Sequence, residues 1–106
     1  MPSDRYEVQL TRLAEKDLER LETWTDRAID ELLALEENPT KGHTLGGVLK
    51  GTRALEFSLP GSGVYRAAYV VQPAERVCLV FIVGSHENIY REAERRVRAL
   101  RRAGEI

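Results

Sequence analysis

The 106-residue sequence predicts an α+β fold, with a small, mainly antiparallel four-stranded sheet, an N-terminal helical hairpin and a C-terminal helix. Three observations predict it. Two amphipathic helical stretches follow each other closely in the first forty residues, three strand-like runs separated by turn residues fill the middle, and a basic helical stretch ends the chain. The expected order is β-α-α-β-β-β-α, in one domain that spans residues 1–106.

The N-terminal part predicts one strand and two helices. Alternation of apolar and polar residues over Tyr6–Leu10 is typical of a short strand. Thr11 and Thr25 are suited to cap the two helices, and Asn38-Pro39 ends the second. The apolar positions of these helices are Ala14, Leu18 and Leu21, and then Ala28, Ile29, Leu32, Leu33 and Leu35. The short connection around Trp24 predicts an antiparallel hairpin with this side chain in the core at its end.

The remaining elements follow from turn residues and alternation. Residues 40–51 contain four glycines and no periodicity, which predicts a loop. Arg53–Leu59 and Val64–Val71 are expected to pair as a hairpin, with Pro60-Gly61-Ser62-Gly63 as its turn. Arg76–Val83 is apolar on both faces, as expected of a central strand. The last helix is expected from about Glu87 to Arg102.

The composition excludes several classes of protein. The single cysteine, Cys78, rules out an internal disulfide framework and fits a reducing cytoplasm, where we expect the protein to be located. It is expected to be inert in the core. The longest apolar run, Val77–Val83, is too short to span a bilayer, and no secretory signal is visible. His43 and His86 are the only histidines, so no zinc spacing exists and neither a metal nor a cofactor is expected.

The net charge of −1 conceals an asymmetry. Residues 1–40 contain 5 basic and 11 acidic side chains, whereas residues 41–106 contain 11 basic and 6 acidic ones. The second part is therefore suited to an anionic partner. The alternative is that these charges only solvate exposed helices.

Arg66 is the first candidate for chemistry. By alternation it shares a face of its strand with Ala68 and Val70, so its guanidinium must be paired or must face a cleft. One interpretation is a salt bridge across the hairpin to Glu56. The other is a permanently charged clamp for phosphate oxygens.

His86 and Tyr90 stand where the central strand gives way to the last helix. A histidine there can transfer protons near neutral pH, and Tyr90 lies one helical turn later. The alternative is that His86 only caps the helix. His43, in the glycine-rich loop, is expected to be a surface residue.

Four further basic residues, Lys50, Arg53, Arg91 and Arg95, are candidates for binding the phosphates of a nucleic acid. The last helix also aligns Arg95 with Arg98 and Arg102 at helical spacing. Such a stripe can follow a nucleic-acid backbone, and it can equally bind an acidic partner peptide.

The sequence as a whole resembles the RelE/ParE superfamily of bacterial type II toxins. The most specific segments are Leu49-Lys50-Gly51, Gly63–Val71, Val83–His86 and Ile89-Tyr90-Arg91. The resemblance implies a compact toxin that a cognate antitoxin neutralises. Members of the RelE type cleave mRNA in the ribosomal A site, whereas members of the ParE type inhibit DNA gyrase without being nucleases.

The resemblance also implies roles for single residues. Arg66 matches the strand arginine that contacts the scissile phosphate, and Tyr90 matches a C-terminal tyrosine of many RelE-like members. His86 stands where an arginine is common, although some relatives use a histidine near this point as acid or base. The basic residues that RelE carries in the preceding strand fall here on Ala54 and Glu56.

The expected function is that of a growth-inhibiting toxin, an RNA-binding mRNA interferase that acts as a metal-independent, ribosome-dependent endoribonuclease and stops translation. Arg66 would stabilise the phosphate with help from Lys50 and Arg53, His86 would transfer a proton, and Tyr90 would orient or stack on a base. Glu56 is a further candidate for the base. The alternatives are a non-catalytic inhibitor of DNA gyrase and an inactive module that only binds its antitoxin. No membrane partner is expected.

Overall fold

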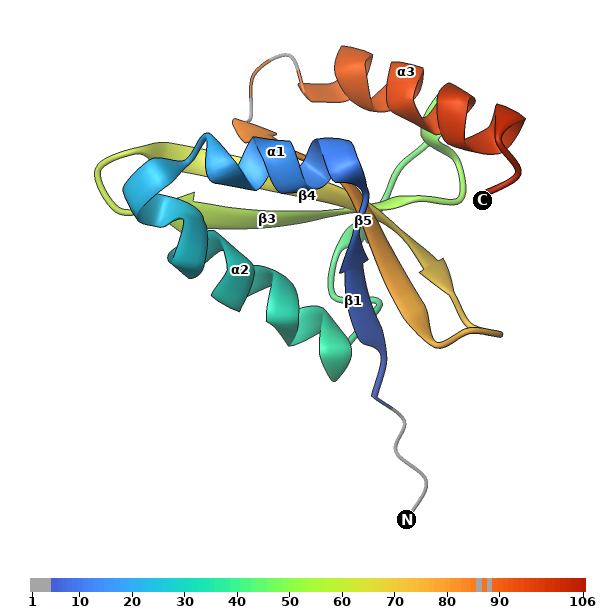
Figure 1. Cartoon of the computed structure of the whole chain (residues 1–106), viewed down its shortest axis with the longest axis horizontal. Coiled ribbons are helices and arrows are strands. Elements are labelled where there is room, and N and C mark those ends of the chain that lie inside the picture. The colour runs from blue at the N-terminus through green and yellow to red at the C-terminus, as the bar shows by residue number, and fades with distance from the viewer. Residues whose placement is uncertain (1–4, 86, 88) are drawn as a thin grey trace.

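The structure, a computed structural model, describes residues 5–85, 87 and 89–106. It combines a five-stranded sheet with three α-helices and three short 3-10 turns (Figure 1). The strands are β1 (Glu7–Leu10), β2 (His43–Thr44), β3 (Arg53–Leu59), β4 (Gly63–Gln72) and β5 (Val77–Ser85). The helices are α1 (Arg12–Glu19), α2 (Thr25–Leu33) and α3 (Ile89–Arg102), and the 3-10 turns are η1 (Glu22–Trp24), η2 (Ala34–Glu36) and η3 (Gly47–Leu49). The predicted α+β class is confirmed.

The strands lie in the order β1-β5-β4-β3-β2, and β5 pairs in parallel with β1. The other three pairings are antiparallel. The sheet has one strand more than the four expected, because His43 and Thr44 pair with Ala54 and Arg53 inside the glycine-rich segment. Two residues are too few to produce an alternation that sequence analysis can recognise.

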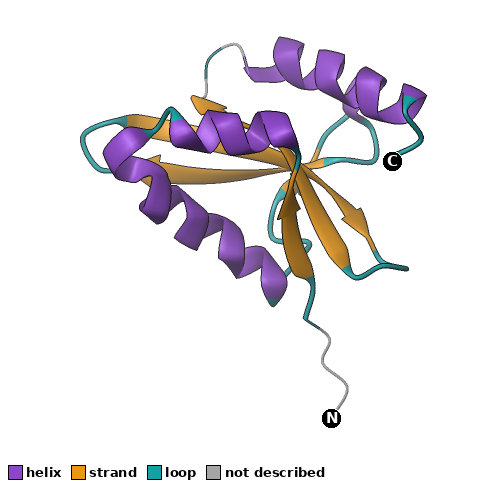
Figure 2. Cartoon of the chain, viewed as in Figure 1, coloured by secondary structure: helices purple, strands orange, loops and turns teal. Residues whose placement is uncertain are grey.

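The helices cover the two faces of the sheet with separate apolar clusters. The α1–α2 hairpin (Figure 2) packs on the first face, where Leu32, Phe57 and Tyr69 belong to one cluster. On the second face, α3 and η3 contribute Val97 and Leu49 to a cluster that also contains Phe81. Since successive strand residues point to opposite faces, the two clusters together bury both sides of β4 and β5.

The hairpin follows the sequence prediction closely. The Thr11 side chain accepts a hydrogen bond of 3.2 Å from the Ala14 amide and caps α1, as predicted. Trp24 packs partly buried against the core. The predicted cap at Thr25 is wrong, because Thr25 is already the first helical residue. Its hydroxyl instead donates a hydrogen bond of 2.6 Å to the Leu18 carbonyl, which links α2 to α1.

A β-bulge interrupts the pairing of the two longest strands. Ala68 faces Ile82, whereas the next residue, Tyr69, faces Val80, so Phe81 is an extra residue on β5. The bulge turns both Phe81 and Ile82 towards the α3 face. β5 also continues to Ser85, beyond the predicted end at Val83.

None of the described helices is long and apolar enough to cross a membrane.

Candidate functional site

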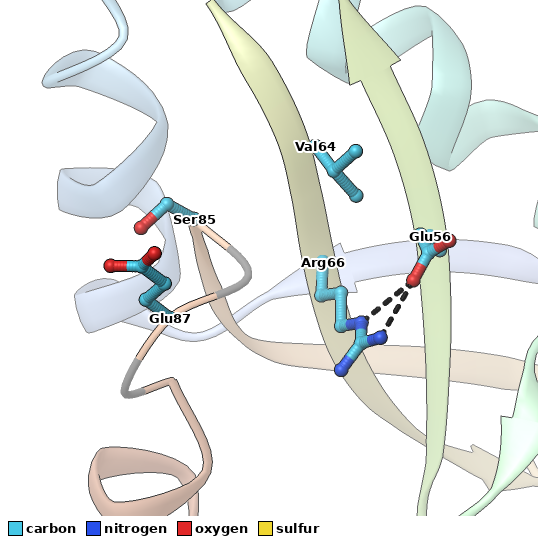
Figure 3. A pocket seen from close by; sticks show the side chains of 5 residues that line it. All are labelled: Glu56, Val64, Arg66, Ser85 and Glu87. Carbon is cyan, nitrogen blue, oxygen red and sulfur yellow. Dashed lines mark hydrogen bonds and ion pairs between the residues drawn. The ribbon is translucent and has the colours of Figure 1, made fainter.

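The β3–β4 hairpin places Glu56 directly opposite Arg66. One carboxylate oxygen of Glu56, Oε2, accepts from Nε of Arg66 at 2.9 Å and lies 2.8 Å from Nη2 (Figure 3). The salt bridge that was one interpretation of Arg66 is therefore present. The Glu56 side chain remains 48% exposed and the Arg66 side chain 17% exposed, so the pair faces a solvent-accessible region rather than the core.

Tyr90 completes this cluster from α3. Its hydroxyl accepts a 2.6 Å hydrogen bond from Nη1 of Arg66, and the guanidinium carbon lies 5.4 Å from the centre of the tyrosine ring. The hydrogen bond to Glu56 is the main cause that raises the pKa of Arg66, against an opposing effect of burial. Arg66 therefore carries a fixed positive charge, held between a carboxylate and an aromatic ring.

The cluster opens into a surface pocket. It is lined by Glu56, Val64, Arg66, Ser85 and Glu87. Figure 3 shows Ser85 and Glu87 across the pocket from the Glu56–Arg66 pair. The pocket thus combines one guanidinium with two carboxylates and a hydroxyl, which are groups that can bind a phosphate, accept a proton and donate a hydrogen bond.

His86 lies outside the described residues, so its predicted role in proton transfer stays a prediction. Its two chain neighbours, Ser85 and Glu87, both line the pocket. Neither neighbour was singled out from the sequence. The only signal that could have found them is their position beside His86, at the switch from strand to helix.

The other predicted basic residues lie elsewhere. Arg53 shares the face of Leu55 and Phe57 by alternation, on the opposite side of β3 from Glu56. Its Nη1 donates to the Gly42 carbonyl at 2.7 Å and to the Thr40 carbonyl at 3.3 Å, which fixes the preceding loop. Lys50 is exposed at the end of η3. Neither Arg53 nor Lys50 lines the pocket.

Arg91 and Arg95 lie on the exposed surface of α3. They line a second hollow together with Glu92, Glu94 and Arg98. The Arg95 side chain is 79% exposed and forms a 2.6 Å ion pair with Glu92. Because acidic and basic groups alternate here, this hollow is less positive than the row of arginines suggests.

The sequence did not reveal a buried charged pair between α1 and α3. Asp17 of α1 is buried and forms a 2.6 Å ion pair with Arg96 of α3. A signal existed, because Asp17 lies between Ala14 and Leu18 on the apolar side of its helix. A carboxylate in that position requires a buried partner. Among the residues that the structure describes, no group of three histidine, cysteine or acidic side chains could hold a metal ion.

Comparison with solved structures identifies the fold. This chain is similar to a chain of the toxin–antitoxin complex RelBE2 of Mycobacterium tuberculosis, with 25% sequence identity and a TM-score of 0.65 over 77% of this chain and 99% of the other. A mutant of Escherichia coli RelE in the free state is 24% identical with a TM-score of 0.69, over 91% of this chain and 98% of the other. The same toxin bound to a peptide of the antitoxin RelB is 27% identical with a TM-score of 0.62, over 84% and 94%.

Sequence comparison identifies the family. A search of curated proteins finds no match. The family model described as "ParE-like toxin of type II bacterial toxin-antitoxin system" matches residues 3–94, which is most of the chain and includes the whole pocket. The resemblance to the RelE/ParE superfamily is thereby confirmed, and the chain belongs to the ParE-like toxins of type II bacterial toxin–antitoxin systems.

Proposed function

We propose that this toxin cleaves mRNA on the ribosome and so inhibits translation. The observation that carries the proposal is the position of Arg66, whose guanidinium binds both the Glu56 carboxylate and the Tyr90 hydroxyl at the wall of an open pocket. A fixed positive charge beside an accessible carboxylate is what cleavage of RNA without a metal requires.

The reaction uses the RNA's own 2′-hydroxyl as nucleophile. A bond forms from the 2′ oxygen to phosphorus, and the bond from phosphorus to the 5′ oxygen breaks. The proton of the 2′-hydroxyl goes to a base, and an acid protonates the leaving 5′ oxygen. We assign the base to Glu56, the stabilisation of the phosphorane to Arg66, and the acid to His86.

Binding of substrate would rearrange the Glu56–Arg66 pair. Nε and Nη2 of Arg66, which now face Glu56, present the parallel donors that a phosphate group accepts. A phosphate at these donors would displace the exposed Glu56 carboxylate. The displaced carboxylate would stay beside the reacting group, where it can accept the proton of the 2′-hydroxyl.

Tyr90 would have two roles in this site. Its hydroxyl fixes the third nitrogen of the guanidinium, so that Arg66 keeps one orientation after Glu56 moves away. Its ring, only partly buried, offers a surface on which a base of single-stranded RNA can stack.

The proposal includes a cognate antitoxin as the regulating partner, in the cytoplasm. Two of the related toxins form complexes with RelB antitoxins, and they are 25% and 26% identical to this chain. We expect the antitoxin to be acidic where it meets residues 41–106, which contain 11 basic and 6 acidic side chains. Lys50, Arg91 and Arg95 are then candidates for contacts with either the antitoxin or the ribosome.

The second candidate is a non-catalytic inhibitor of DNA gyrase. The specific observation in its favour is the family model, which is named for ParE rather than for RelE. The pocket also supports it, because two carboxylates and one guanidinium line the opening. The charged groups of this lining therefore include more carboxylates than guanidinium groups, which disfavours binding to a phosphate-rich target such as mRNA.

Two assays run side by side separate the candidates. The first follows cleavage of mRNA on programmed ribosomes in a single turnover, and the second follows DNA supercoiling by gyrase. We expect cut mRNA and unaffected supercoiling. Arg66→Ala should slow cleavage by roughly a hundredfold, because a preorganised charge is lost in the transition state. Arg27→Ala, which removes an arginine of α2 that is 53% exposed and does not line the pocket, is the matched control and should cleave at the normal rate. Intact mRNA together with inhibited supercoiling would establish the second candidate instead.

A further inference from the structure

Asp17 is a buried carboxylate that the proposed reaction does not use. Its side chain is only 7% exposed, and it lies on the buried side of α1 beside Ala14 and Leu18. Oδ2 accepts from Nη1 of Arg96 at 2.6 Å, and Oδ1 accepts from Nη2 at 3.2 Å. The pair is therefore a bidentate ion pair between α1 and α3, in which two parallel hydrogen bonds fix the relative orientation of the guanidinium and the carboxylate.

The same pair completes the open edge of β5. β1 follows β5 only as far as Val80, so later backbone groups on that side have no neighbouring strand. Asp17 Oδ2 accepts from the Val83 amide at 3.0 Å, and Arg96 Nη1 donates to the Phe81 carbonyl at 3.0 Å. The ion pair thus fixes α1, β5 and α3 at one point, just beyond the bulge at Phe81.

This point is a directional attachment of α3 to the sheet. The helix buries Ile89, Ala93 and Val97, and packs Tyr90 and Leu100 beside them, but apolar burial has no preferred direction. The hydrogen bonds of the Asp17–Arg96 pair do have one. A second polar attachment, from Arg101 to the carbonyls of Val48 and Lys50, holds the other end of the helix.

Tyr90 depends on this placement. It lies six residues before Arg96 on the same helix, about 9 Å along the axis. Its hydroxyl meets Arg66 at 2.6 Å, so a shift of α3 by about 1 Å would break the contact. Displacements of that size in a catalytic site can reduce rates by roughly a hundredfold.

We propose that Asp17 is a positioning residue, which sets the register of α3 through Arg96 and thereby holds Tyr90 against Arg66. The effect on cleavage rests on the proposed function, whereas the effect on the Arg66–Tyr90 contact does not. α1, which packs on the opposite face of the sheet from α3, would thereby help to shape a pocket that it does not line.

The test compares three variants of the full chain by NMR and by cleavage. Asp17→Asn removes the charge with little change of shape. The double variant Asp17→Asn/Arg96→Gln keeps hydrogen-bonding groups at the β5 edge without a buried unpaired charge, so that folding is preserved if the single substitution is too costly. Glu92→Gln is the matched control. It removes the other carboxylate that contacts Arg96, at 2.9 Å, but this one belongs to α3 itself.

The NMR readout is the ¹³Cζ resonance of Tyr90, assigned by its loss in Tyr90→Phe, and the contact between its ring protons and the Arg66 side chain. We expect this resonance to move and the contact to weaken in Asp17→Asn or in the double variant, while the amide spectrum of the sheet persists. Cleavage on programmed ribosomes should show a kcat lower by roughly ten- to a hundredfold, with KM nearly unchanged. Glu92→Gln should match the wild type in both measurements.

Three outcomes would overturn the inference. They are a wild-type Tyr90 signal in a folded variant without the Asp17 carboxylate, an equal displacement in Glu92→Gln, and a fall in cleavage without any displacement of Tyr90. If wild-type protein leaves mRNA intact, the proposed function fails, and the NMR comparison still decides whether Asp17 positions Tyr90.

Discussion

The hydroxyl of Tyr90 lies 2.6 Å from Nη1 of Arg66, although the two residues are 24 positions apart in the sequence. This bond joins the first turn of α3 to the middle of β4. Together with the Glu56 carboxylate, it leaves Arg66 engaged at all three of its nitrogens. The pocket is therefore organised around one cation whose orientation two side chains determine.

Removing the Tyr90 hydroxyl should impair cleavage more than folding. Tyr90→Phe keeps the ring and its apolar packing but deletes one hydrogen bond to a charged group, so we expect the single-turnover rate of cleavage to fall by roughly tenfold. Tyr65→Phe is the matched control, because that hydroxyl contacts only the exposed Ser62 side chain among the hydrogen bonds of the described residues, at 3.0 Å. Single-turnover cleavage and urea unfolding measure the two effects. Equal rates for the two variants would remove the hydroxyl from the site.

Neutralising Glu56 tests the assignment of the base. Glu56→Gln keeps the shape of the side chain but removes its ability to accept a proton, so cleavage should fall by roughly a hundredfold or more. The acidic limb of the pH–rate profile should change as well. The free energy of unfolding should change by less than about 1 kcal/mol, because the pair is exposed on the Glu56 side.

Glu87→Gln provides the comparison within the same pocket, since Glu87 also lines it. A base is defined by where it sits and not by its charge alone, so this variant should keep most of its activity. If Glu87→Gln is the slower enzyme of the two, the base has been assigned to the wrong carboxylate.

The sequence predicted the parts of the site that depend on local pattern. Alternation over 53–59 and 64–71, together with the turn between them, was enough to anticipate that Glu56 and Arg66 face each other across a hairpin. The contact from Tyr90 could not be anticipated, because it depends on how α3 docks on the sheet. That docking rests on the bulge at Phe81 and on the Asp17–Arg96 pair, and neither follows from the periodicity of a single segment.

The roles of the basic residues could not be predicted from the sequence. A count of arginines cannot distinguish a free cation from one that the fold already uses. Arg53 is bound to loop carbonyls, Arg96 is paired with a buried carboxylate, and Arg101 holds η3. Of the arginines in the last helix, Arg95 is largely exposed and keeps its place as a candidate for contact with a partner.

The loop before β2 should be intolerant of a side chain at Gly42. A Cβ there would lie 2.7 Å from the Ala54 carbonyl oxygen and 2.9 Å from Cε1 of Tyr69, and the first of these belongs to the backbone of a paired strand. We expect Gly42→Ala to lower the free energy of unfolding by about 1–3 kcal/mol. Urea unfolding followed by Trp24 fluorescence measures the change.

Gly46→Ala is the control for that experiment. At Gly46 the backbone has a φ of −117°, and apart from Gly46 and its two chain neighbours no atom of the described residues lies within 4 Å of the added Cβ. This variant should be as stable as the wild type or slightly more stable. A Gly42→Ala protein with unchanged stability would mean that the loop relaxes away from β3 at little cost.

The stability of the protein should decrease in alkaline solution because of Cys78. Burial raises the pKa of this thiol from 9.0 to about 11, and the side chain is fully buried. Between these two values the folded protein keeps a proton that the unfolded chain releases. The contribution of Cys78 to the free energy of unfolding is therefore complete below pH 9 and is lost as the pH rises towards 11. The loss at the upper end is about 2–3 kcal/mol.

Cys78→Ala isolates this contribution. Tyr69, whose pKa burial also raises, remains in the variant and still weakens the fold above pH 10. Because Tyr69 contributes to both proteins, the difference between them reports Cys78 alone, and it should begin near pH 9 and grow up to the highest pH measured. Urea unfolding at half-unit steps from pH 7 to pH 10.5 gives both profiles. Parallel profiles would show that Cys78 does not ionise in the unfolded chain more readily than in the fold, and that the alkaline loss arises from Tyr69 alone.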